Sequence, residues 1–184
     1  MNFKITIRNG FELRLREEAD AEACFKVVDE NRNRLRTWLP WLDNTTTPAD
    51  MATYLRKCRD NFATTGSPDL GIWYDGRWIG SGGFHDWDKT NRKSSIGYWI
   101  SEEFQGKGLV TEAVKAFFRY GFEEMNLNKI EIHCAVNNSR SRAIPERLGM
   151  KQDGILRDDG WLYDHFEDIV IYSIIKEEWK TAKK

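Results

Sequence analysis

The sequence has few of the residues that build metal sites and disulfide frameworks. Its 184 residues include three cysteines and three histidines, which are far apart and show no Cys-x-x-Cys, His-x-x-His or His-Glu-x-x-His spacing. Three widely spaced thiols are typical of a reducing compartment and of packing roles. We therefore expect no disulfide framework and no metal site.

Long apolar runs and a strong charge of one sign are also missing. The first ten residues, MNFKITIRNG, lack the apolar core of a secretory signal, and no stretch approaches the ~20 apolar residues of a membrane span. The formal net charge is −1 and the basic residues are spread along the chain, whereas nucleic-acid binding needs a basic face. These observations predict a cytoplasmic protein with no nucleic-acid partner and no membrane partner.

Length and composition favour one ordinary folded domain. A chain of 184 residues with 40% hydrophobic and 31% charged residues can bury a substantial core without covalent staples. No repeat, linker or change in composition separates two parts of it. We expect a single domain over residues 1–184.

Alternating and helical apolar patterns predict an α+β fold. Strands are expected near residues 3–7, 11–15, 70–74, 77–84, 96–100, 129–136, 151–157 and 168–175. Helices are expected from an Asp20 cap to about residue 34, from Pro48 to about residue 64, over 110–125, and up to residue 148 before a Gly149 cap. Asn9-Gly10 and Asp75-Gly76 predict hairpin turns, and loops are expected around residues 86–91 and between the last two strands.

The most informative segment is the loop 105–108 (QGKG), which separates the strand expected at 96–100 from the helix expected at 110–125. Two glycines let the backbone approach a ligand closely, and a helix opening from such a loop directs N–H groups and a positive dipole end at one place. This arrangement indicates an anion site, with phosphate as the usual anion. It is not a Walker loop, because no Gly-Lys-Ser/Thr follows a four-residue spacer, and it is not a Rossmann fingerprint, because Thr111 stands where the third glycine is needed. An ordinary strand-to-helix turn is the alternative interpretation.

Several motifs then resemble one enzyme family. Residues 105–110 (QGKGLV) resemble the acetyl-CoA signature of the GNAT N-acetyltransferases, Gln/Arg-x-x-Gly-x-Gly/Ala. Val110 departs from Gly/Ala but can still donate its N–H. Residues 96–99 (IGYW), 111–113 (TEA), 138–141 (NSRS) and 147–150 (RLGM) are similar to the RimJ/RimL branch, which contains ribosomal-protein N-terminal acetyltransferases. The resemblance extends from about residue 11 to residue 172, and it implies a central mixed, mostly antiparallel, twisted sheet flanked by helices.

The resemblance implies an acetyl-CoA site built mostly from backbone, with no metal. The glycine loop and the first helical residues would bind the pyrophosphate, and Lys107 would add a charge. The strand end at 98–101 would pair with the pantetheine arm and supply an oxyanion-type donor, and Asn138 would hydrogen-bond the same arm. The expected cofactor residues are Tyr98, Trp99, Ile100, Ser101, Gln105, Gly106, Lys107, Gly108, Leu109, Val110, Thr111 and Asn138.

The resemblance also implies a proton donor and a general base. Ser141 matches the serine that RimL-like enzymes place near the sulfur to protonate the leaving group; a helix-capping hydroxyl is the alternative interpretation. Relatives carry a base glutamate at positions where this chain has Ser95 and Gly160. Asp159 is our candidate base, although most exposed carboxylates are only solvated. The substitutes are Glu102, Asp86 and His85.

Two tryptophans are candidates for the acceptor site. Trp38 and Trp41 bracket Pro40 in a segment that is too apolar for an ordinary loop. They could plug one end of the core, or they could form the wall of the acceptor groove, which RimL-like enzymes line with the region between the first two helices. We place His85 with them as a third acceptor-binding residue.

The absence of a clear base favours an acceptor that is readily deprotonated. A protein α-amine has a pKa near ~8, so roughly a tenth is neutral at pH 7, whereas a lysine at ~10.4 is neutral in only about one molecule in two thousand. The difference corresponds to about 3 to 4 kcal/mol of deprotonation that an enzyme would have to supply. An N-terminal α-amine is therefore the expected acceptor, and the resemblance implies that it belongs to a ribosomal protein.

Two other functions stay open at this stage. The first is acetylation of a small amine such as a polyamine, an aminoglycoside or an amino acid; a polyamine would suit the acidic residues at 158, 159, 164 and 167. The second is a non-catalytic CoA-binding sensor that has lost its base. The sequence also leaves a homo-oligomer open.

Overall fold

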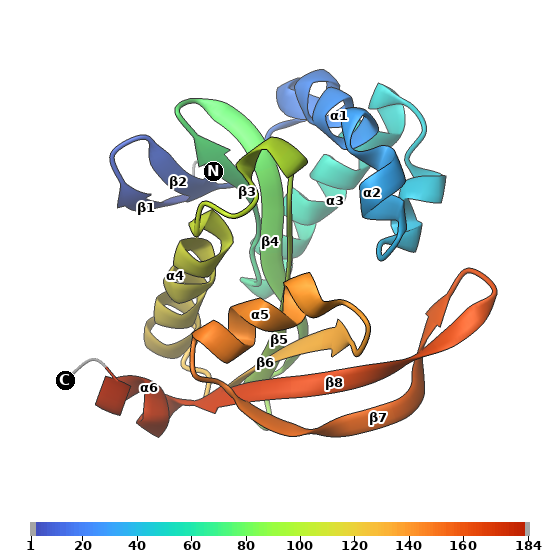
Figure 1. The fold of residues 1–184 in the computed structure, drawn as a ribbon. Helices are drawn as coiled ribbons and strands as arrows, with labels where there is room; N and C mark the ends of the chain where they lie inside the picture. Colours follow the sequence, from blue (N-terminus) through green and yellow to red (C-terminus); the bar gives the residue numbers. More distant parts are fainter. Residues whose placement is uncertain (1–2, 183–184) are drawn as a thin grey trace. The chain divides into compact units, whose positions relative to one another are not determined.

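The computed structural model describes residues 3–182 as an α+β fold (Figure 1). Its strands are β1 (Lys4–Arg8), β2 (Phe11–Arg14), β3 (Asp69–Tyr74), β4 (Arg77–Asp88), β5 (Lys93–Ile100), β6 (Lys129–Ala135), β7 (Lys151–Leu162) and β8 (His165–Ile175). Its α-helices are α1 (Ala21–Glu30), α2 (Arg32–Arg36), α3 (Pro48–Thr65), α4 (Leu109–Glu123), α5 (Ser139–Arg147) and α6 (Lys176–Ala182). Short 3-10 helices are η1 (Glu18–Asp20), η2 (Pro40–Asn44) and η3 (Glu102–Phe104).

The strands form one mixed sheet of eight strands, in the order β1-β2-β3-β4-β5-β6-β8-β7. β5 and β6 pair in parallel, while β1–β2, β2–β3, β3–β4, β6–β8 and β7–β8 pair antiparallel. The fold class expected from the sequence is therefore confirmed.

The chain packs as two compact units. The first comprises the residues up to Gly83 together with Tyr98–Ala113, and the second comprises Phe84–Gly97 together with the residues from Val114 onward. The expectation of one domain over residues 1–184 stays a prediction, and its first two and last two residues lie outside the described part of the chain. Among residues 3–182, no helix combines the length and the apolar character needed to cross a membrane.

The core of the first unit lies between the N-terminal helices and the strands β3 and β4. Its buried members are Ala21, Cys24, Val28, Leu35, Leu42, Met51, Leu55, Trp73 and Trp78. The helix α3 begins at Pro48, as predicted. Pro48 occupies the first helical turn, and the Thr47 hydroxyl caps the helix by accepting the N–H of Asp50 at 3.2 Å. The helix ends at Gly66, whose φ of +80° is left-handed.

The second unit is built around β6, β8 and the later turns of α4. Phe84 packs edge-to-face against Phe117, with ring centroids 5.6 Å apart. Gly121 lets α4 pack closely against Ile130, because a Cβ at Gly121 would lie 2.9 Å from a methyl of Ile130. β8 pairs with β6 over Ile169–Ile175, and β7 and β8 continue together as a long ribbon, drawn in orange and red in Figure 1.

Two helix predictions were wrong in detail. The helix expected up to residue 34 is broken at Asn31, which adopts φ −106° and ψ 5° between α1 and α2. The carboxylate of Asp20 does not cap α1, since it accepts the N–H of Glu17 at 2.8 Å in the preceding 3-10 turn. The C-terminal helix α6 was not predicted at all.

Two loop predictions were also wrong. Residues 86–88 belong to β4, which continues to Asp88 through a left-handed residue at Asp86. The polar segment after residue 157 belongs to β7 and β8, whose register shifts between Leu156 and Gly160. A two-stranded ribbon that is exposed on both faces needs no apolar alternation, so its residues resembled a loop.

Candidate active site

The expected site residues fall in both units, and each group is described within its own unit. Those at 38–41 and 98–111 belong to the first unit, whereas His85, Asn138, Ser141 and Asp159 belong to the second.

The glycine loop has the backbone conformation that only glycine adopts readily. Gly106 and Gly108 have φ values of +73° and +75°, and a Cβ at either would meet no atom within 4 Å. Lys107 is exposed between them, and its Nζ lies 4.9 Å from the ring centroid of Phe104. The loop thus presents bare backbone and one cation to solvent.

The helix that follows the loop supplies N–H groups at its first turn. The N–H of Glu112 donates to the carbonyl of Gly108 at 3.1 Å, which is the first turn of α4. The N–H groups at the start of a helix point toward a ligand placed at that end. They and the positive end of the helix dipole form a suitable place for an anion such as a pyrophosphate.

Replacing Gly108 by valine is expected to weaken acetyl-CoA binding at least about tenfold, because a side chain then stands where the phosphate must approach bare backbone. Titration calorimetry of the folded variant measures this. Gly76→Val is the matched control: Gly76 has φ +76° and equally open surroundings, in the β3–β4 turn. The Gly76→Val variant has the same backbone strain as Gly108→Val but in a turn outside the proposed site, so its affinity for acetyl-CoA should stay at the wild-type value. Equal affinities for Gly108→Val and the wild type would remove this loop from the site.

The end of β5 is held firmly on one side. The N–H of Ser101 donates to the carbonyl of Ile79 at 2.7 Å, and a Cβ at Gly80 would lie 2.3 Å from the carbonyl oxygen of Trp99. Gly80 therefore lets the backbone of β4 approach that of β5 closely. These contacts fix the course of the strand end at 98–101.

The other edge of β5 pairs only briefly. In the described part of the chain, the parallel register joins Lys93–Ser95 to Lys129–Glu131, and Ile96 and Gly97 have no partner on β6. A strand edge without a neighbouring strand can pair with an extended ligand.

Sequence reasoning missed two residues that support this strand end. Asn31, at the break between α1 and α2, accepts the N–H of Glu102 on its Oδ1 at 2.8 Å. Arg34 donates to the carbonyl of Ile100 at 2.7 Å and to Oδ1 of Asn31 at 3.2 Å. No local pattern signals these contacts, since the partners are separated by 66 to 71 residues in the chain.

The two tryptophans are both half-buried. Trp41 packs against the core of the first unit and stacks on Tyr54, with ring centroids 6.3 Å apart and planes 9° apart. Trp38 follows α2 directly and is not part of that core cluster. Trp41 thus contributes to the core, and the acceptor wall stays a prediction for both.

Asn138 and Ser141 meet at the start of α5 in the second unit. Oδ1 of Asn138 caps the helix by accepting the N–H of Ser141 at 3.1 Å. Since Asn138 supplies the cap, a ligand would meet its NH2 group. The hydroxyl of Ser141 is half-buried and lies 3.2 Å from Sγ of Cys134 on β6. Burial raises the pKa of the Cys134 thiol, so this neighbour stays neutral.

A second group of contacts orients α5. Arg142, next to Ser141, donates to the carbonyl of Val136 at 3.0 Å and to the hydroxyl of Tyr172 at 3.1 Å. Tyr172 in turn donates to Glu146 at 2.6 Å. These bonds tie the helix to β8 and fix where the Ser141 hydroxyl points.

The candidate base Asp159 is exposed within β7, in the irregular stretch between Leu156 and Gly160. The preceding Asp158 has φ +51°, and its N–H donates to the carboxylate of Asp168 at 2.9 Å. Its exposure is that of an ordinary solvated carboxylate. Its role as a base stays a prediction.

The substitutes for the base lie on two different stretches of chain. Glu102 is exposed in η3, while His85 and Asp86 are exposed near the end of β4. Ser95 is buried, and its Oγ lies 3.4 Å from the carbonyl of His85 and 3.4 Å from Oδ2 of Asp86. His85 and Ser95 are therefore neighbours.

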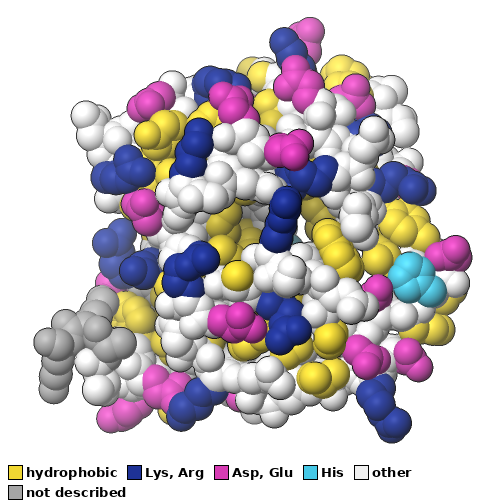
Figure 2. Space-filling model, in the orientation of Figure 1, with side chains coloured by type: hydrophobic (Ala, Val, Ile, Leu, Met, Phe, Trp, Pro, Cys, Tyr) yellow, Lys and Arg dark blue, Asp and Glu magenta, His cyan; other side chains and the backbone are white. Residues whose placement is uncertain are grey.

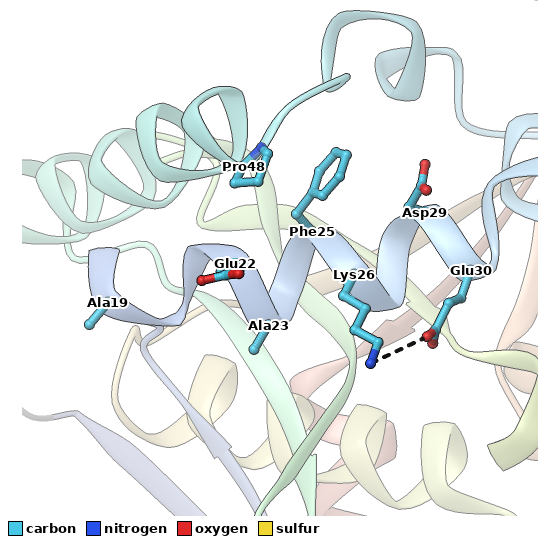
Figure 3. Close-up of a pocket in the computed structure, with 8 residues that line it drawn as sticks. All are labelled: Ala19, Glu22, Ala23, Phe25, Lys26, Asp29, Glu30 and Pro48. Atoms are coloured by element: carbon cyan, nitrogen blue, oxygen red, sulfur yellow. Dashed lines mark ion pairs between the residues drawn. The ribbon is translucent and has the colours of Figure 1, made fainter.

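A surface hollow of about 590 Å³ lies elsewhere in the first unit, along α1 (Figure 3). It is lined by Glu22, Phe25, Lys26 and Pro48 among others, and Lys26 pairs with Glu30 at 4.0 Å. None of its lining residues is an expected site residue. On the face shown in Figure 2, basic and acidic side chains are interspersed, without one dominant patch of either sign.

Comparisons with known proteins agree with this geometry. A family model described as Acetyltransferase (GNAT) domain matches residues 11–151. The chain is 37% identical to "Putative ribosomal N-acetyltransferase YdaF" of Bacillus subtilis (strain 168), over 98% of this chain and 100% of that protein.

Solved structures share the fold. One titled "Crystal structure of Probable acetyltransferase" is 36% identical, with a TM-score of 0.91 over 96% of this chain and 99% of that one. A RimL ribosomal L7/L12 alpha-N-protein acetyltransferase in complex with coenzyme A is 22% identical, with a TM-score of 0.90 over 96% of this chain and 99% of that one. Because the family model spans most of the chain and the Bacillus relative aligns along its whole length, this protein is an acyltransferase of the GNAT N-acetyltransferase family, as the motif at residues 105–110 predicted.

Proposed function

We propose that this enzyme transfers the acetyl group of acetyl-CoA to the N-terminal α-amine of a ribosomal protein. The observation that carries the proposal is the pair of left-handed glycines, Gly106 and Gly108, in the loop that directly precedes α4. The acceptor is supported by the names of two similar proteins, one a ribosomal N-acetyltransferase and the other an acetyltransferase of ribosomal L7/L12.

The cofactor residues divide the work along acetyl-CoA. The residues 105–111 bind the pyrophosphate through backbone N–H groups, and Lys107 adds its charge. The strand end at 98–101 pairs with the pantetheine arm and polarises the thioester carbonyl, and the amide NH2 of Asn138 binds the same arm. The fixed course of β5 beside Gly80 supports this assignment.

Ser141 protonates the leaving thiolate in this proposal. Its hydroxyl is half-buried beside a neutral thiol, and Asn138 already provides the helix cap. The competing assignment of Ser141 as a capping hydroxyl is weakened by this division of roles. Trp38 and Trp41 form the acceptor wall.

A cytoplasmic location belongs to the same proposal. The three cysteines, Cys24, Cys58 and Cys134, are free and buried. Burial raises the pKa of Cys24 and of Cys58 to about 12, so these thiols are unreactive packing groups, which suits a reducing compartment.

Acetylation of a small amine is the second candidate. Asp158, Asp159 and Asp164 are exposed on the β7–β8 ribbon, where Glu167 accepts from His165 at 3.3 Å. A polyamine could bind such carboxylates. A panel of small amines run beside the peptides therefore belongs in the experiment.

Peptides with a free N-terminus are expected to react faster than the same peptides with a blocked N-terminus and an internal lysine. The amine must arrive neutral through its own pKa, which favours the α-amine by about 3 to 4 kcal/mol. Between about pH 7 and 9, the rate should rise with the titration of the α-amine and then level off. Steady-state rates on the two peptide series measure both effects. A preference for the lysine peptides would show that the enzyme holds a strong base.

A further inference from the structure

His85 lies beside an irregularity near the end of β4. The next residue, Asp86, has φ +52°, the left-handed region that non-glycine residues occupy at bulges and turns. The Ser94 hydroxyl donates to the carbonyl oxygen of His85 at 2.6 Å, and the Ser95 hydroxyl donates to the same oxygen at 3.4 Å. Two hydroxyls thus fix the backbone from which the His85 side chain leaves the strand.

The imidazole of His85 lies directly on the backbone of β5. Phe84 is buried in the core against Phe117, and successive strand residues point to opposite faces, so His85 leaves on the other face and is exposed. A Cβ built on Gly97 would be 2.9 Å from Nε2 of His85 and 3.1 Å from Cδ2. The glycine therefore makes room for the ring, one residue before the proposed pantetheine strand at 98–101.

Ser95 lies beside this position, and its hydroxyl contacts the carbonyl of His85 and the carboxylate of Asp86. A serine hydroxyl does not accept a proton near neutral pH, whereas an imidazole does. His85, whose ring lies on the backbone of β5, is the neighbouring side chain with a nitrogen that can accept a proton.

We propose that His85 is the general base of the reaction, an inference that rests on the proposed acetyl transfer. The neutral amine attacks the thioester carbonyl carbon, so an N–C bond forms and the C–S bond breaks, with its electron pair leaving on sulfur. The nitrogen, positively charged after attack, gives a proton to Nε2 of His85, directly or through one water. The thiolate takes the proton of Ser141, and solvent restores Ser141 and discharges His85.

His85→Gln tests the proposal through the pH profile of kcat/KM. The wild-type rate should need both a neutral amine and a neutral base, so the logarithm of kcat/KM should rise with slope two at the acid end of the profile and with slope one before it levels off. His85→Gln should lower kcat/KM at pH 7 at least about tenfold and show slope one throughout. Tyr120, which packs against Phe84, is unchanged in the variant. The other charged side chains of the β4–β5 hairpin are also unchanged, and they are Asp86, Asp88, Lys89, Arg92 and Lys93.

Two further variants separate chemistry from folding. His133→Gln is the matched control, because His133 is also exposed and lies on β6 with its ring 3.1 Å from Glu131; it should keep the wild-type profile. Gly97→Ala displaces the ring, so it should lower the rate in wild type but not further in His85→Gln. Added imidazole should restore part of the rate to His85→Ala.

The outcomes distinguish this proposal from the proposed function. The variants are measured on whichever acceptor the wild-type enzyme acetylates. If that acceptor is a small amine and not a peptide, the proposed acceptor is wrong. The ratio of kcat/KM between variant and wild type tests His85 as the base in either case. His85→Gln within a factor of two of wild type, with both slopes intact, would overturn the assignment of His85.

Discussion

Replacing Ser141 by alanine is expected to lower kcat by about ten- to a thousandfold and to leave the KM for acetyl-CoA nearly unchanged, since the hydroxyl acts only as the thiolate leaves. The hydroxyl is half-buried, lies 3.2 Å from Sγ of Cys134, and sits on a helix that Arg142 anchors to Tyr172. Steady-state kinetics with a free-N-terminus peptide separates kcat from KM.

Ser139→Ala is the matched control for this experiment. Ser139 opens the same helix, is exposed, and lies two residues before Ser141. It should keep kcat within a factor of two, because it loses a hydroxyl on α5 without touching the proposed donor. If Ser141→Ala also stays within a factor of two, its hydroxyl has only a structural role.

Replacing Arg16 by methionine is expected to cost about 3 to 5 kcal/mol of stability, because it leaves the Asp69 carboxylate without its buried cation. The Arg16 side chain is 2% exposed; it pairs with Asp69 and donates to the Ser81 hydroxyl at 2.7 Å. Burial disfavours its charge, but the carboxylate of Asp69 raises the pKa of Arg16 above its ordinary value, so it stays charged. Tyr54 also donates to Asp69, at 2.7 Å, and Trp41 stacks on that ring.

Urea denaturation measures the loss of stability, and a chain of this length should also melt roughly 6 to 20 °C lower. Glu18→Gln is the control: it removes the Glu18–Arg56 pair, in which both side chains are more than half exposed, and should cost far less stability than Arg16→Met. Equal losses in the two variants would contradict the structural role assigned to the buried pair.

The parts of the fold that the sequence predicted correctly are specified by local residues. Pro48 after Thr47 starts α3, Gly149 has the left-handed φ of +70° expected after α5, and the glycines of 105–108 stand between a strand and a helix. Each of these signals acts within one turn of backbone, so a sequence pattern can reveal it.

The features that could not be predicted depend on distant partners. Asn31 breaks the first helix and its side chain binds the N–H of Glu102, 71 residues away. Asp86 can stay within a strand at positive φ because the Ser94 hydroxyl holds the neighbouring carbonyl of His85. The contact between Ser141 and Cys134 likewise joins a helix to a strand, and no spacing in the sequence indicates it.

Tandem mass spectrometry of ribosomal proteins incubated with the enzyme and acetyl-CoA tests the central claim most directly. We expect a single acetyl group, of about 42 Da by composition, on the N-terminal nitrogen of one or a few of these proteins, formed faster as the pH rises toward 8 because the α-amine loses its proton. The Ser141→Ala enzyme should form the same product at least about tenfold more slowly. Acetyl groups found only on lysine side chains, or on none of the ribosomal proteins while a small amine is acetylated, would contradict it.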